Sequence, residues 1–124
     1  MMTESLKKLQ QLKILSDVME SEKQTKLAKA RLHERQIKDR LTQLSEDRQT
    51  QHDAANGFEE VASLEVWMAW SRRKVADEKA KQARQRAEIE RCLTDLKAAF
   101  GRSSAIDGLL KREQAEIRQK RSRP

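Results

Sequence analysis

The residue types that could do chemistry are few in this chain and poorly spaced for it. His33 and His52 lie nineteen positions apart, and neither has a second ligand-type side chain at a metal-site spacing. The single cysteine, Cys92, permits no internal disulfide and is expected to be a small core residue. Adjacent carboxylates such as Glu59 and Glu60 are frequent, but a solvated helix does not desolvate them for acid–base catalysis. No phosphate-binding glycine loop or nucleophile motif is present. We therefore expect a protein that is not an enzyme and has no cofactor and no metal.

The composition is typical of long helices. Charged residues make up 38% of the 124 residues and aromatic residues only 3%. Neither glycine nor proline occurs between Thr3 and Ala55, whereas a globular domain is punctuated by both far more often. No run approaches the roughly 20 apolar residues of a membrane span, and no signal peptide is visible. The sequence predicts a cytoplasmic all-α protein without a transmembrane segment.

The formal net charge of +7 indicates an acidic partner. Nucleic acid, an anionic membrane and an acidic protein surface all fit that charge. The basic runs are not interleaved with stacking aromatic residues, which disfavours nucleic acid. A membrane-surface helix is disfavoured because each helix needs its apolar stripe for the other. A protein partner is therefore favoured, and a nucleic-acid-binding helical protein stays open as a less favoured alternative.

Two helical segments are separated by a break near the midpoint of the chain. Asn56 and Gly57 readily take the backbone conformations that end a helix, and Asn56 with Glu59 reads as the capping box of the next one. We expect one domain over 1–124: a helix over 3–55, a bend over 56–62 and a helix over 63–120. Gly101 and Gly108 leave open a break over 100–104, although a continuous helix is favoured.

A heptad pattern of apolar residues predicts that the two segments pair. In the first segment the seam consists of Leu6, Leu9, Leu27, Ala30, Ile37, Leu41 and Leu44. Between Leu9 and Leu27 the same register would place polar residues inside, namely Lys13, Ser16, Glu20 and Lys23. The apolar residues of that stretch are instead Leu12, Leu15 and Met19. The sequence therefore predicts a stutter there, which would shift the seam toward them.

The second segment carries a more regular seam. One set of positions is Val61, Met68, Val75, Gln82, Ile89, Leu96, Ser103, Leu110 and Ile117. The companion set is Leu64, Ser71, Glu78, Gln85, Cys92, Ala99, Ile106 and Glu113. Antiparallel pairing of Leu6 with Leu110, and of Leu44 with Ser71, gives residue numbers that sum to 115 or 116, which centres the turn near residue 58. We expect a long two-helix antiparallel coiled-coil hairpin.

Two tryptophans follow the bend at a short distance. Trp67 and Trp70 flank the seam of the second helix, with Arg73 in a basic run beside them. Large rings here could wrap the tip and hold the loop against the first helix. They could equally form a partner-binding patch, in which tryptophan is a common anchor. Both interpretations remain open.

The layout resembles a known family, the FliJ-type proteins of flagellar export and their YscO-type relatives in virulence type III secretion. The similarity lies in the helix that begins with Leu6-Lys7-Lys8-Leu9, the aromatic segment over 64–70 and the run over 100–113. It covers most of the chain and rests on pattern rather than on a sharp motif. The chain ends on Arg121-Ser122-Arg123-Pro124 and lacks the acidic ending often seen in flagellar members.

The resemblance implies a central stalk that inserts its terminal end into a hexameric export ATPase. It also implies contacts with the export gate protein and with substrate chaperones, at the periphery of a membrane-bound export apparatus. On this basis Trp67, Trp70 and Arg73 are expected to contact the gate. The ATPase side is expected to use Leu6, Leu110, Arg112, Ile117 and Arg118.

A second interpretation comes from a different class of protein. The same heptad seams could pair between chains, which would make the protein a generic coiled-coil scaffold or dimerisation module.

Overall fold

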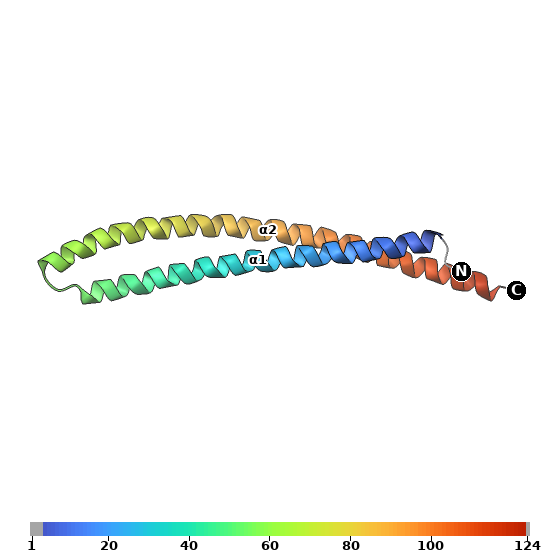
Figure 1. Cartoon of the computed structure of the whole chain (residues 1–124), viewed down its shortest axis with the longest axis horizontal. Helices are drawn as coiled ribbons and strands as arrows, with labels where there is room; N and C mark the ends of the chain where they lie inside the picture. Colours follow the sequence, from blue (N-terminus) through green and yellow to red (C-terminus); the bar gives the residue numbers. More distant parts are fainter. Residues whose placement is uncertain (1–3, 124) are drawn as a thin grey trace. The chain divides into compact units, whose positions relative to one another are not determined.

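The computed structural model describes residues 4–123, which form two helices. Helix α1 spans Glu4–Ala54 and helix α2 spans Phe58–Ser122 (Figure 1). These residues contain no strand, so the predicted all-α fold class of two antiparallel helices is confirmed. The helix start expected at Thr3 lies outside the described residues.

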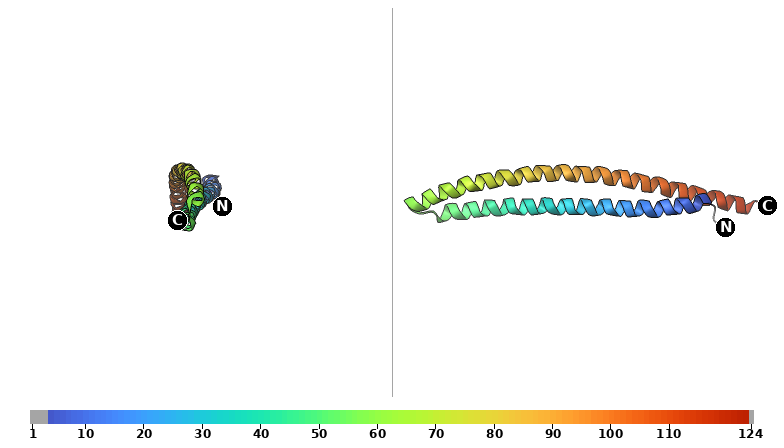
Figure 2. Two further views of the ribbon diagram at one scale, coloured as in Figure 1. Left: turned by 90° about the vertical axis from the view of Figure 1, so that its left-hand side faces the viewer. Right: turned by 45° about the horizontal axis from the view of Figure 1, so that its top comes forward.

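The chain forms two compact units, each of which pairs a stretch of α1 with a stretch of α2. Over the described residues, the terminal unit comprises 4–28 and 91–123, and the turn unit comprises 29–90. In the turn unit the two helices run in opposite directions from the loop that joins them (Figure 1). In the terminal unit the end of α2 reaches beyond the start of α1, as both side views show (Figures 1 and 2).

The turn is shorter than the sequence predicts. Gly57 has a φ of 102°, the positive value expected there, whereas Asn56 keeps a negative φ. The expected bend over 56–62 is wrong, because α2 already begins at Phe58 and the amide of Val61 donates to the carbonyl oxygen of Gly57 at 3.0 Å. The backbone amide of Asn56 donates to the carboxylate of Glu60, so the residue four positions on, not Glu59, caps the turn. Carboxylates in this first turn also suit the positive end of the helix dipole.

The seam predicted for α2 is confirmed from Leu64 onward, whereas Val61, the first predicted position, is 47% exposed. Every buried residue of this helix falls on the two predicted sets of positions: Ser71, Glu78, Cys92, Ala99, Ser103 and Leu110. The helix is continuous through 100–104, so the alternative of a break there is wrong. Gly101 and Gly108 are exposed, and the buried residues on either side supply the packing that offsets the cost of glycine in a helix.

The stutter predicted for α1 is wrong. The seam keeps its strict heptad register, with Ser16 buried and Lys13, Glu20 and Lys23 half-buried. Long charged side chains can occupy such positions because their stems pack while their ends reach water. The apolar residues that suggested the stutter, Leu12, Leu15 and Met19, are exposed.

Polar contacts across the helices keep the predicted antiparallel register in each unit. In the turn unit the side chain of Gln85 donates to the carbonyl oxygen of Ala30 at 3.1 Å, and these numbers sum to 115. In the terminal unit Lys13 donates to Ser103 at 2.9 Å, and these numbers sum to 116. A shift by one heptad would break both hydrogen bonds, so the polar layers help to fix the pairing.

Candidate functional site

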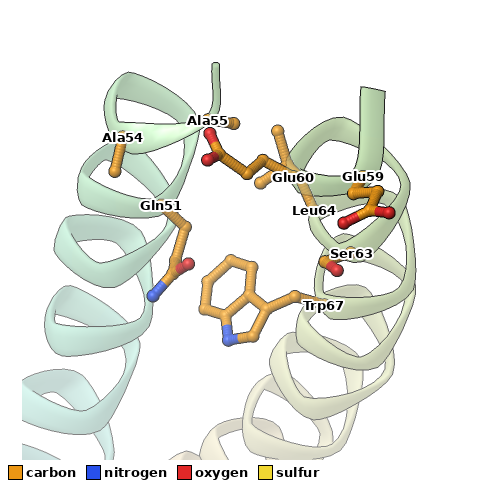
Figure 3. Close-up of a pocket in the computed structure, with 8 residues that line it drawn as sticks. All are labelled: Gln51, Ala54, Ala55, Glu59, Glu60, Ser63, Leu64 and Trp67. Carbon is orange, nitrogen blue, oxygen red and sulfur yellow. The ribbon is translucent and has the colours of Figure 1, made fainter. Parts of the chain in front are cut away.

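A cleft opens between the two helices next to the turn. Its volume is about 480 Å³. It is lined by Gln51, Ala54, Ala55, Glu59, Glu60, Ser63, Leu64 and Trp67. Figure 3 shows the indole ring of Trp67 pointing from α2 into this space, toward Gln51 on α1, with Glu60 across the open end near Ala55. We call this space the turn cleft.

The two tryptophans have different surroundings. Their ring centroids are 6.1 Å apart and the ring planes are tilted by 47°, which is favourable aromatic packing. Trp67 is half-buried in the turn cleft, whereas Trp70 is 46% exposed. Arg73, the third residue expected on the gate side, is also exposed. The inward ring of Trp67 fits the tip-holding interpretation and the outward ring of Trp70 fits the patch interpretation.

The turn is acidic, a feature that the sequence analysis missed. Residues 46–66 contain six acidic residues and a single basic one, Arg48, which gives this stretch a net charge of −5 in a chain of +7. A count of charges within this window identifies the acidic stretch. The net positive charge of the whole chain does not show it. The basic run Arg72-Arg73-Lys74 begins just beyond this stretch. The turn therefore presents negative charge, with cations only at its border.

Exposed apolar side chains accompany this acidic charge. Phe58, at the first position of α2, is 91% exposed, and Val66 is 73% exposed. Exposed apolar groups that lie close together mark binding surfaces more often than single ones do. Together with Trp70 they form the apolar part of the turn surface.

The terminal unit carries almost all of the net charge. Its described residues include 14 basic and 8 acidic residues, a net charge of +6, whereas the turn unit has 13 basic and 12 acidic residues, a net charge of +1. Arg112 and Arg118 are exposed and Ile117 is half-buried near the end of α2. Leu6 and Leu110 are buried, so both side chains belong to the core of the unit in this structure.

A polar cluster crosses the terminal unit at Lys13. Its ammonium group lies 3.0 Å from the carboxylate of Asp17 and donates to the hydroxyl of Ser103. Ser103 in turn donates to Asp17 at 3.2 Å. The hydrogen bond to Asp17 raises the pKa of Lys13, because it favours the charged form. The ammonium group of Lys13 therefore helps to hold α1 against α2.

A buried carboxylate, Glu78, lies at the centre of the turn unit. The guanidinium Nε of Arg40 donates to it at 3.0 Å from the other helix, and Lys81 lies 3.4 Å away on the same helix. Burial opposes ionisation of Glu78, but the hydrogen bonds from Arg40 and Lys81 outweigh it and lower its pKa. The carboxylate is therefore ionised at neutral pH and paired, which suits a structural role.

The other candidates for chemistry are separated in the structure. His33 and His52 are exposed, and Cys92 is buried as predicted for a core residue. Over the described residues 4–123, no group of three or more potential ligand side chains could hold a metal ion. Neither helix has, in its described part, a stretch apolar enough to cross a membrane.

The chain was compared with protein-family models, with curated proteins and with solved structures, and none of them matches it. The resemblance to FliJ-type and YscO-type proteins therefore stays a prediction.

Proposed function

We propose that this protein is a non-enzymatic component of a type III export system, similar to the FliJ and YscO stalk proteins. The terminal unit binds the hexameric export ATPase, and the turn surface binds the export gate protein. Substrate chaperones are further partners of the same assembly, at the periphery of the membrane-bound apparatus. The observation that carries this proposal is the division of charge, with a net +6 on the terminal unit and −5 on residues 46–66. Two ends of opposite charge suit two different partners.

The end of α2 supports the ATPase contact. Against Glu113 and Glu116 this part of the chain carries six basic residues, the last of them just beyond the helix: Lys111, Arg112, Arg118, Lys120, Arg121 and Arg123. A basic helix end is drawn into a channel lined by acidic residues, and asymmetric contacts there favour some ring conformations over others. This is how a protein without catalytic residues can change the turnover of an ATPase.

The turn supports the gate contact. Trp70, Val66 and Phe58 are exposed apolar side chains, and exposed tryptophan is a common anchor of protein interfaces. The acidic residues around them select a partner surface that is basic at its edge. Arg73 lies at the border of this surface and pairs with an acidic group of the same partner.

The test is the ATPase activity of the cognate export ATPase with and without the purified protein. We expect stimulation, and we expect the double variant Arg112→Glu, Arg118→Glu to weaken it. The matched control is Arg35→Glu with Lys38→Glu, which reverses two exposed charges in the turn unit and is expected to leave stimulation unchanged. Absence of stimulation together with absence of co-purification would contradict the proposed ATPase contact.

A further inference from the structure

Five large apolar side chains lie exposed within eight positions of α1. They are Leu12, Ile14, Leu15, Val18 and Met19, with exposed fractions of 48%, 67%, 56%, 50% and 37%. They account for five of the twelve large hydrophobic residues that are exposed in the described part of the chain. We call them the outer face of the terminal unit.

The outer face is one continuous surface. Leu12, Leu15 and Met19 follow the three-and-four spacing of one helical row, and Ile14 and Val18 form the adjoining row. The first row borders a groove of about 180 Å³ that α2 completes with Ala99, Arg102 and Ile106. Apolar surface of this kind is unfavourable in water, so a covering partner is expected.

The inner seam does not use these residues although they are adjacent to it. It contains Lys13, Ser16 and Glu20 at the same level, which are half-buried or buried. A helix that keeps polar residues inside and a continuous apolar surface outside has a second face suited to packing. The exposure of the outer face is therefore not explained by the packing of α1 against α2.

The charges that flank the outer face identify the occupant. The exposed charged residue nearest to the outer face on its N-terminal side is Lys8, and the nearest one on its C-terminal side is Glu22. A second copy that runs antiparallel about Leu15 would place Lys8 opposite Glu22 of the partner subunit, twice by symmetry. A parallel copy would place lysine against lysine and glutamate against glutamate. This pair of flanking charges therefore favours the antiparallel direction over the in-register parallel one.

We propose that two copies of this chain associate through their outer faces, antiparallel, with Leu15 at the two-fold axis. This contact differs from an exchange of the heptad seams, because each chain keeps its own pairing of α1 with α2. A single helical face is smaller than the roughly 1,200 Å² of total buried area that stable interfaces usually exceed. We therefore expect a weak, reversible dimer.

Sedimentation equilibrium of the full chain over a range of concentrations tests the association. We expect a reversible monomer–dimer equilibrium that Leu15→Lys abolishes, because it places two ammonium groups at the axis. Lys8→Glu and Glu22→Lys should each raise the Kd by about three- to tenfold. The double variant Lys8→Glu with Glu22→Lys restores both opposite-charge contacts, so its Kd should return close to that of the wild type. Helicity and melting of each variant serve as the folding control, since all three positions are exposed.

Disulfide trapping tests the geometry. In a Cys92→Ala background, Leu15→Cys should oxidise to a covalent dimer, whereas Gln24→Cys, exposed on another side of α1, should not. A chain that stays monomeric up to about 1 mM would overturn the proposal. A dimer that tolerates Leu15→Lys, or an outer face that only a different protein covers, would overturn it as well. None of these outcomes depends on the export ATPase, so they leave the proposed function to its own test.

Discussion

Glu78 of α2 accepts a hydrogen bond of 3.0 Å from Arg40 of α1, and its carboxylate is 1% exposed. Removing Arg40 leaves a buried carboxylate that only lysines of its own helix compensate. Because Arg40 is itself about half exposed, water recovers part of the loss. We expect Arg40→Gln to lower the free energy of unfolding by about 1 to 2 kcal/mol, measured by urea denaturation. The control Lys38→Gln, at an exposed position, should stay within about 0.5 kcal/mol of wild type.

The same carboxylate predicts a dependence of stability on pH. The pKa of Glu78 is lowered from 4.5, so the folded protein releases this proton more readily than the unfolded chain. Its contribution is complete above the unfolded pKa and is lost as the pH falls through the folded pKa. We expect the stability difference between wild type and Glu78→Gln to be greatest at neutral pH and to shrink below about pH 4.5. Equal acid sensitivity of the two proteins would show that Glu78 is not the group responsible.

Replacing glycine by alanine is expected to change stability in opposite directions at Gly57 and Gly101. The φ of 102° at Gly57 strains any other residue although no atom lies within 4 Å of an added Cβ, so Gly57→Ala should destabilise by about 1 to 2 kcal/mol. Gly101 lies inside α2 with equally open space, so Gly101→Ala should stabilise by about 0.5 to 1 kcal/mol. Thermal melting of both variants tests these two predictions. A Gly57→Ala variant that melts above wild type would be inconsistent with the observed turn.

The sequence predicts much of this fold because local signals and packing agree. Asn56-Gly57 marks the turn, and the regular seam from Leu64 to Leu110 gives the buried face of α2. The prediction fails at Leu12, Leu15 and Met19 because the apolar residues of this stretch lie beside the seam, and hydrophobicity alone predicts that they meet α2. The regular partner seam holds α1 in register, and the cluster of Lys13, Asp17 and Ser103 makes that register acceptable.

The candidate site is less predictable than the fold. The positions of Trp67 and Trp70 beyond the bend identify the region, but their spacing does not tell which ring points into the turn cleft. The side chain of Leu110 belongs to the core, although its place near the end of α2 suggested a partner contact. Orientation depends on packing between helices, which a single heptad pattern specifies only along the seam.

The two tryptophans are expected to differ in their effect on stability. Trp67 is half-buried in the turn cleft, so Trp67→Ala should lower the free energy of unfolding by about 1 to 2 kcal/mol. Trp70→Ala should lower it by no more than about 1 kcal/mol, because that ring is 46% exposed and loses mainly its packing against Trp67. Urea denaturation separates these effects. A large loss for Trp70→Ala would indicate that this ring holds the turn together and is not available to a partner.

The division of the molecule into two binding ends is the central claim, and a pair of binding measurements tests it most directly. Affinity for the cytoplasmic part of the export gate and affinity for the export ATPase are measured for Trp70→Ala and for Arg112→Glu with Arg118→Glu. The account predicts that Trp70→Ala weakens gate binding alone and that the arginine variant weakens ATPase binding alone. Loss of both affinities in either variant, or of neither in both, would contradict it.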